Sequence, residues 1–195
     1  MSEAQSYANL AAAHSCWGML SATEEQQRRI LVEPRALDSY YNVLFSLLLF
    51  WQTQGYRWPE RLTIVSHAFK RERLVDLHCA AIGFPADRVG YIGINPPPEL
   101  LDNNAAAQQG IREAVAHWRA DPDGSGALLA GKRRRRNPHG VSQTLFADSP
   151  SDLMRSGLSA RSIPAAASEC RWKEEGLAPD SARPWAAILP STSHR

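Results

Sequence analysis

Residues 62–94, LTIVSHAFKRERLVDLHCAAIGFPADRVGYIGI, contain two short apolar runs on either side of a helical segment. The runs LTIVS, residues 62–66, and VGYIGI, residues 89–94, are bounded by turn-forming residues, which is typical of strands. Between them, apolar spacing predicts a helix over residues 69–82, with Gly83 as its stop. Because LTIVS shows no polar alternation, we expect it to be buried on both faces.

The alternation of strand and helix extends toward the amino terminus. The run ILVE, residues 30–33, ends at Pro34 and predicts another buried strand. Asp38 or Ser39 then caps a helix whose apolar stripe continues to about Trp51, and residues 2–19 have the spacing of a further helix. Strands that alternate with helices of this length indicate right-handed β-α-β units. The sequence therefore predicts an α/β fold with a parallel sheet and flanking helices.

The carboxyl-terminal part of the chain is less regular. We expect a last helix over residues 99–120, then the turn DPDGSG at 121–126 and the basic run GKRRRRN at 131–137. From residue 149 onward Ser, Pro and Ala dominate. The expected organisation is an α/β domain over residues 1–148 and a loosely ordered tail over residues 149–195.

Composition excludes several classes of protein. The net charge of 195 residues is only +2, so any electrostatic preference must be local. The longest apolar run, residues 43–51, is about half of the roughly 20 residues that span a bilayer, and no signal peptide precedes it. Cys16, Cys79 and Cys170 form no CxxC pair, and no His spacing suits a metal. We expect a cytoplasmic protein with no membrane partner and no metal; oligomeric state is not predictable from the sequence.

The loop that follows LTIVS carries an unusual group of cations. In a parallel sheet, the loops after the strands meet at one edge, which is where such folds bind ligands. Lys70, Arg71 and Arg73 occupy the first turn of the predicted helix, where the macrodipole disfavours each cation by about 0.3–1 kcal/mol. A bound anion would compensate them, together with Ser66 and His67. The alternatives are an ion pair with Glu33 or Asp38 of the adjacent loop, or simple solvation.

The loop over residues 33–42 falls on the same predicted edge. Ser39 and Asn42 lie one helical turn apart, so both side chains can face a ligand there. Glu33 and Asp38 supply carboxylates, and Asp38 could accept a hydrogen bond from a ribose hydroxyl. The alternative, which local sequence favours, is that Asp38 and Ser39 only cap the helix.

These two loops carry a family resemblance. ILVEPRALDSYYNVLFS, residues 30–46, followed by SHAFKRERL, residues 66–74, resembles the SanA/YdcF/ElyC-like family (domain of unknown function 218), with the fungal branch most similar. The resemblance covers about residues 2–146 and implies a Rossmann-like fold with a polar pocket at the strand edge. It also implies S-adenosylmethionine as a candidate ligand, without a common reaction. The matching positions are Glu3, Glu33, Ser39, Asn42, Ser66, His67, Lys70 and Arg71.

One departure from the family pattern matters. Family members carry a strand and a glycine-rich loop ahead of the helix that begins here at Ser2. We expect that the chain lacks this first strand because it is a truncated product, an incomplete gene model or a degenerate copy.

Two functional hypotheses follow. In the first, the domain binds an anionic or nucleotide-type small molecule, and His67 is the candidate general acid or base if a reaction occurs. In the second, it is a non-catalytic remnant or a protein-interaction domain with an exposed sheet edge. The run from Lys132 to Arg136 could also direct nuclear import or contact nucleic acid, but no aromatic platform accompanies it. We favour a solvated or ligand-adjacent loop there over nucleic-acid binding.

Overall fold

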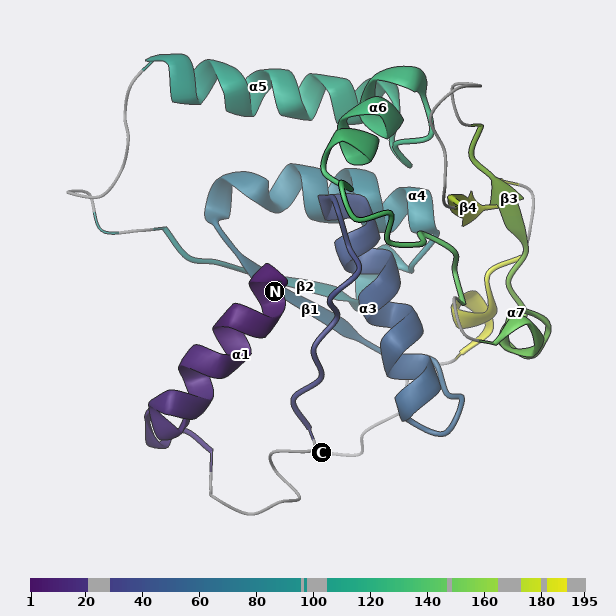
Figure 1. The fold of residues 1–195 in the computed structure, drawn as a ribbon, viewed down its shortest axis with the longest axis horizontal. Helices are drawn as coiled ribbons and strands as arrows, with labels where there is room; N and C mark the ends of the chain where they lie inside the picture. The colour runs from purple at the N-terminus through teal and green to yellow at the C-terminus, as the bar shows by residue number, and fades with distance from the viewer. Residues whose placement is uncertain are drawn as a thin grey trace.

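The structure is a computed structural model that describes residues 1–20, 29–95, 97, 105–146, 149–164, 173–179 and 182–188. The α-helices are α1 (Glu3–Ala13), α3 (Ser39–Thr53), α4 (Ala80–Ile82), α5 (Ala105–Ala120), α6 (Ala127–Arg135) and α7 (Pro150–Ser156) (Figure 1). The strands are β1 (Leu62–Ser66), β2 (Val89–Gly93), β3 (Ala160–Ser162) and β4 (Glu175–Leu177). A π-helix, η3 (Glu72–Cys79), leads into α4, and short 3-10 turns occur at η1 (Ser15–Gly18), η2 (Ala68–Lys70), η4 (Ala86–Arg88) and η6 (Pro184–Ala187).

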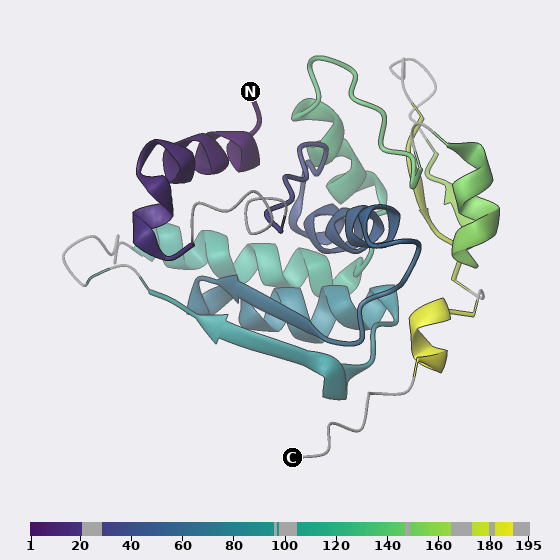
Figure 2. The ribbon, with the colours of Figure 1, turned by 90° about the horizontal axis from the view of Figure 1, so that it is seen from below.

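The centre of the fold is a β-α-β unit. β1 and β2 pair in parallel, in a register that runs from Leu62 opposite Val89 to Ser66 opposite Gly93. The connection through η3 and α4 ends at Gly83, which adopts a left-handed φ of 78° that favours glycine. Figure 2 shows α3, α5 and this connection on one side of the two strands. The predicted α/β class, with a parallel sheet and flanking helices, is therefore confirmed.

The expected burial of both faces of β1 is wrong. Along β1, half-buried and exposed positions alternate. Val65 is 59% exposed, and Ile92 of β2 is 52% exposed. The reason is that the described helices pack on one face of the sheet only. The outer face therefore presents apolar side chains to the surroundings.

The predicted strand at residues 30–33 does not form. The Glu33 carboxylate accepts hydrogen bonds from the backbone N–H groups of Arg35 at 2.8 Å and Ala36 at 2.9 Å, which turns the chain. Pro34 contributes no N–H group, and Ile30 and Leu31 remain exposed. Among the described strands, β1 consequently pairs with β2 alone and has one open edge.

α3 supplies most of the buried apolar surface. Asp38 caps it by accepting a hydrogen bond from the Tyr41 N–H at 2.9 Å, as the sequence predicts. The buried side chains of this helix are Tyr40, Tyr41, Val43, Leu44, Phe45, Leu47, Leu48 and Trp51. Within the core, the ring of Trp51 stacks on Trp58 at 5.3 Å, and Trp58 meets Trp185 edge to face at 5.0 Å.

The described parts of the carboxyl-terminal region are packed against this core. β3 and β4 pair in an antiparallel hairpin, and Leu158, Ile163, Leu177 and Trp185 belong to the same buried cluster as α3. In these stretches the structure differs from the loosely ordered tail that the composition predicts, because large apolar side chains anchor a segment rich in small and polar residues. The boundary between residues 148 and 149 stays a prediction.

Two further expectations concern helices. α5 is described from Ala105, so the predicted beginning near Glu99 lies outside the described residues. The basic run at 131–137 is mostly helical, as part of α6, where a loop was expected. Lys and Arg are good helix formers and are favoured in the last turn of a helix, close to the negative end of the macrodipole.

None of the helices in the described ranges combines the length and apolar character needed to cross a membrane.

Candidate functional site

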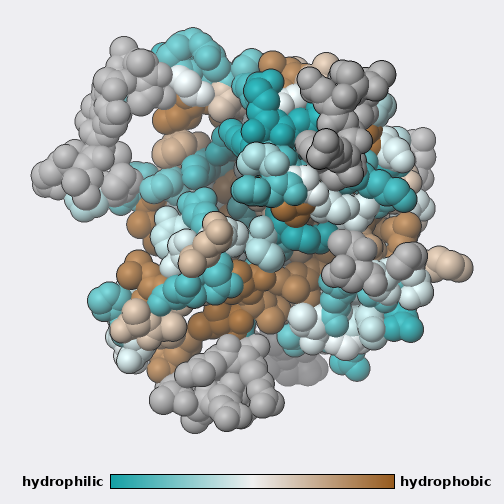
Figure 3. Space-filling view, in the orientation of Figure 1, coloured by the Kyte–Doolittle hydropathy of each residue, from teal (hydrophilic) through white to brown (hydrophobic). Residues whose placement is uncertain are grey.

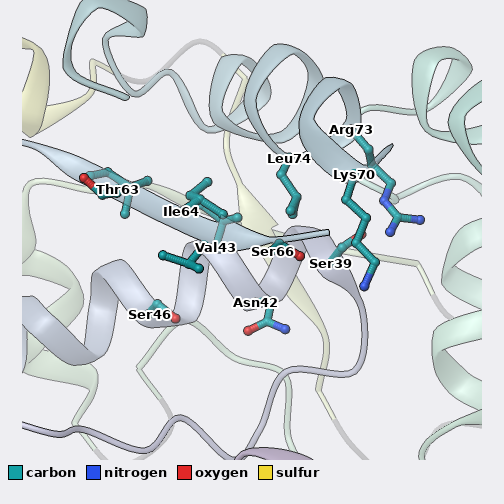
Figure 4. Close-up of a pocket in the computed structure, with 12 residues that line it drawn as sticks. Ser39, Asn42, Val43, Ser46, Thr63, Ile64, Ser66, Lys70, Arg73 and Leu74 are labelled. Carbon is teal, nitrogen blue, oxygen red and sulfur yellow. The ribbon is translucent and has the colours of Figure 1, made fainter. Parts of the chain in front are cut away.

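A cavity of about 320 Å³ lies at the open edge of β1, between this strand, α3 and the beginning of η3 (Figure 4). We name it the edge cavity. Its lining residues are Ser39, Asn42, Val43, Ser46, Leu62, Thr63, Ile64, Val65, Ser66, Lys70, Arg73 and Leu74. All five residues of β1 contribute, because no described strand covers this edge.

The polar side chains of the edge cavity come from α3 and from the junction that follows β1. Ser39, Asn42 and Ser46 lie on one face of α3, at intervals of three or four residues. Ser66 ends β1, and Lys70 follows one turn later. Figure 4 shows Asn42 and Lys70 reaching the cavity from two different helices. The structure therefore places Ser39, Asn42, Ser66 and Lys70 around one space, although the segment before Ser39 is a turn and not the strand that the sheet-edge argument assumed.

The edge cavity is positively charged. Lys70 and Arg73 line it, and no carboxylate does. Arg73 is partly buried, and burial, followed by the nearby charge of Arg136, lowers its pKa. Its Nε atom is buried and has no hydrogen-bond partner among the described residues. An anionic group in the cavity would relieve both deficits.

A buried histidine lies behind the cavity wall. The Ser39 Oγ atom is 2.9 Å from the Nε2 atom of His78, whose side chain has no exposed surface. Burial lowers the pKa of His78 to about 3, so the ring is neutral at pH 7. The Pro122 carbonyl partly offsets this effect, although Nδ1 has no hydrogen bond of good geometry in the described chain. A ring with so low a pKa is a weak base, and it fixes the orientation of the Ser39 hydroxyl.

Sequence reasoning did not predict the position of His78 behind the cavity. The signal that could have found it is its spacing, since His78 lies four residues after Leu74, and both side chains are buried. Arg73 was named in the sequence analysis among the cations that a bound anion would compensate, but it is not one of the positions that match the family.

Two residues expected at the site point elsewhere. The Nδ1 atom of His67 lies 3.3 Å from the Ile94 carbonyl oxygen, and its ring stacks on Phe69 at 5.5 Å. Arg71 forms an ion pair with Asp76 at 2.9 Å. Neither lines the edge cavity. The structure therefore gives no support to His67 as a general acid or base at this cavity.

The two expected carboxylates have structural partners. Glu33 holds the turn described above and lies 3.7 Å from the Arg35 guanidinium. Asp38 forms an ion pair with Arg133 at 2.5 Å, and Arg133 also binds Glu174 at 2.5 Å. The Arg133 side chain is only 1% exposed, so these ion pairs lie inside the protein. They connect the cap of α3, helix α6 and the residue that precedes β4. The basic run consequently does not present five exposed charges.

Nothing in the described residues resembles a metal centre, because no three His, Cys, Asp or Glu side chains lie close enough together to hold an ion. Glu3, another position of the family resemblance, is on α1 and does not line the edge cavity.

Comparison with known proteins gives one distant relative. An uncharacterized protein of Saccharomyces cerevisiae, YOR238W, is 29% identical over 116 residues. The match covers 56% of this chain and 38% of the yeast protein, so the chain spans well under half the length of that relative. No protein-family model matches the chain, and no solved structure matches it significantly.

Proposed function

We propose that this protein binds an anionic, nucleotide-type small molecule in the edge cavity. The observation that carries the proposal is the convergence of hydroxyl, amide and cationic side chains from α3 and from the junction after β1 on one cavity. Ser39, Ser66 and Asn42 offer neutral hydrogen bonds, and Lys70 supplies a charge-assisted one. Parallel sheets commonly bind small ligands beside the carboxyl ends of their strands, which is where Ser66 and Lys70 lie.

The charges favour a phosphate-bearing ligand over S-adenosylmethionine. Lys70 and Arg73 attract phosphate oxygens, whereas the sulfonium of S-adenosylmethionine carries a positive charge that they would repel. S-adenosylmethionine remains the candidate that the family resemblance suggests, so both classes belong in the test. We propose no reaction for the site.

Isothermal titration calorimetry with ATP, ADP, AMP and S-adenosylmethionine tests the proposal. The matched variants are Lys70→Gln, inside the cavity, and Arg71→Gln, its neighbour outside it. Loss of one charge-assisted hydrogen bond is worth about 1.5–3 kcal/mol, so Lys70→Gln should weaken binding about tenfold or more. Arg71→Gln should bind like the wild type. A folded wild-type protein that binds none of the four compounds would defeat the proposal.

A second candidate function is a protein-interaction domain. It is favoured by the open edge of β1 and by the exposure of Val65 and Ile92 on the outer face of the sheet. The simplest partner is a second copy of the chain. Sedimentation equilibrium should then show self-association that Val65→Lys abolishes, whereas a monomer at all concentrations would count against this partner.

A further inference from the structure

A second cavity, of about 240 Å³, lies next to the edge cavity, between η3, α5 and α6. Ser39 and Arg73 line both cavities, so the two are contiguous at these side chains. The second cavity also contains Lys132, Arg133 and Arg136 in its lining. We name it the basic cavity. It combines residues of the β1–β2 connection with residues of the basic run, which are about sixty positions apart in the sequence.

Only one cation of the basic cavity is neutralised by carboxylates in the described part of the chain. Arg133 is bound by Asp38 and Glu174, which lie within ion-pairing distance of its guanidinium. Arg73, Lys132 and Arg136 have no Asp or Glu oxygen within 4 Å among the residues that the structure describes. The cavity therefore gathers three cations that have no ion-pair partner among the described residues, and its lining carboxylate, Asp38, is bound to Arg133.

Hydrogen-bond donors are also in excess there. Arg136 donates one hydrogen bond, from Nη1 to the Leu37 carbonyl at 3.2 Å. The Nζ atom of Lys132 lies 3.3 Å from the Nδ1 atom of His117. An arginine carries five N–H donors and a lysine three, so most donors of these two residues are available. The buried Nε atom of Arg73 adds another within the described chain.

Mutual repulsion is visible in the electrostatics of the cluster. After burial, the charge of Arg136 is the next cause that lowers the pKa of Arg73. The charge of Asp38 opposes this effect to a smaller extent. An anion bound between the two guanidinium groups would favour their charged forms.

We propose that the basic cavity binds an oligophosphate group, held by Arg73, Lys132 and Arg136. Phosphate oxygens are acceptors only, and guanidinium groups match them in two-point contacts. The cations come from η3 and from α6, and the volume is several times the roughly 30 Å³ of a water molecule, which suits more than one phosphate. The inference rests on the proposed function: because the cavities share Ser39 and Arg73, the ligand is a nucleoside diphosphate or triphosphate whose remaining part occupies the edge cavity.

Inorganic tripolyphosphate tests the basic cavity by itself. Calorimetry at low ionic strength compares the wild type with Lys132→Gln, Arg136→Gln and Arg135→Gln. Arg135 belongs to the same run and is exposed, but it does not line the cavity, which makes it the matched control. We expect about tenfold weaker binding, or more, for the first two variants and wild-type binding for the control. Arg136 is exposed, so Arg136→Gln keeps the test valid if Lys132→Gln fails to fold.

Two results would overturn the inference: no binding of tripolyphosphate to the wild type, or equal binding by Arg136→Gln and Arg135→Gln. Equal binding by these two variants would mean that tripolyphosphate is attracted by the overall positive charge of α6 and not by the basic cavity. Failure of this inference is distinguishable from failure of the proposed function, because nucleotide binding by Lys70→Gln reports on the edge cavity alone. A protein that binds ADP through Lys70 but ignores tripolyphosphate would retain the first proposal and lose this one.

Discussion

Lowering the pH from 7 to 5 should reduce the free energy of unfolding by about 2 kcal/mol through His78. The ring is fully buried, with Trp118 edge-on at 4.4 Å and Tyr40 at 5.9 Å. Burial, with a smaller contribution from Arg73, lowers its pKa from 6.5 to about 3. The unfolded chain therefore takes up a proton as the pH falls through 6.5, whereas the folded chain does not until about pH 3.

The sign and size of the effect follow from this difference in proton uptake. The stabilisation is complete above pH 6.5 and is lost progressively as the pH falls from 6.5 toward 3. About one and a half pH units of that window lie above pH 5, and each is worth about 1.4 kcal/mol. The loss between pH 7 and pH 5 is therefore about 2 kcal/mol.

Urea unfolding at pH 5, 6 and 7 measures this loss in the wild type, His78→Gln and His139→Gln. His139 is exposed on the turn after α6, so its replacement should leave the pH dependence unchanged. Other groups contribute equally to all three proteins, and the comparison isolates His78. If His78→Gln and the wild type lost stability in parallel, the reasoning would be refuted.

Further predictions concern stability and are read from equilibrium unfolding. Arg133→Gln should cost about 3–5 kcal/mol, because it leaves two buried carboxylates without their partner, whereas Arg135→Gln should change little. Gly124→Ala should destabilise by about 1–2 kcal/mol or more, since this residue has a φ of 66° and an added Cβ would lie 2.8 Å from a tryptophan ring. Gly110→Ala, in α5 with nothing within 4 Å, should instead stabilise by up to about 1 kcal/mol. Trp185→Ala should cost about 3–5 kcal/mol if the carboxyl-terminal segment completes the core, and near-zero cost would contradict that packing.

The fold was predictable where local signals and packing agree. The apolar runs that became β1 and β2, the cap at Asp38 and the stop at Gly83 are all short-range features. Residues 30–33 have the same β-branched character but form no strand, because pairing is decided by neighbours and by the turn that Glu33 stabilises. Local sequence does not contain that information.

The site was predictable to the level of its location. The rule that ligands bind at the carboxyl ends of parallel strands locates Ser66, whereas Ser39 reaches the same cavity from the beginning of α3, which no strand precedes among the described residues. Which cations face the cavity depends on the helix that follows. In the π-helix, positions five residues apart become neighbours, which is consistent with the pairing of Arg71 and Asp76. Spacing rules for α-helices do not anticipate this pair.

The burial of residues in the basic run, residues 131–137, was not predictable from the sequence either. As sequence it is a surface feature, but the fold buries Arg133 and turns Lys132 toward His117. Figure 3 shows polar residues beside a large apolar area on one face of the molecule. Burial within such a surface depends on contacts with residues distant in the sequence.

The most direct test of the account is an NMR titration of the ¹⁵N-labelled protein with ADP. If the cavities bind the nucleotide, amide shifts should concentrate at the beginning of α3, around Ser39 and Asn42, and after β1, around Ser66 and Lys70, and extend to Arg136 on the phosphate side. Shifts confined to the outer face of the sheet around Val65 and Ile92, or no saturable shifts from a folded sample, would contradict the account.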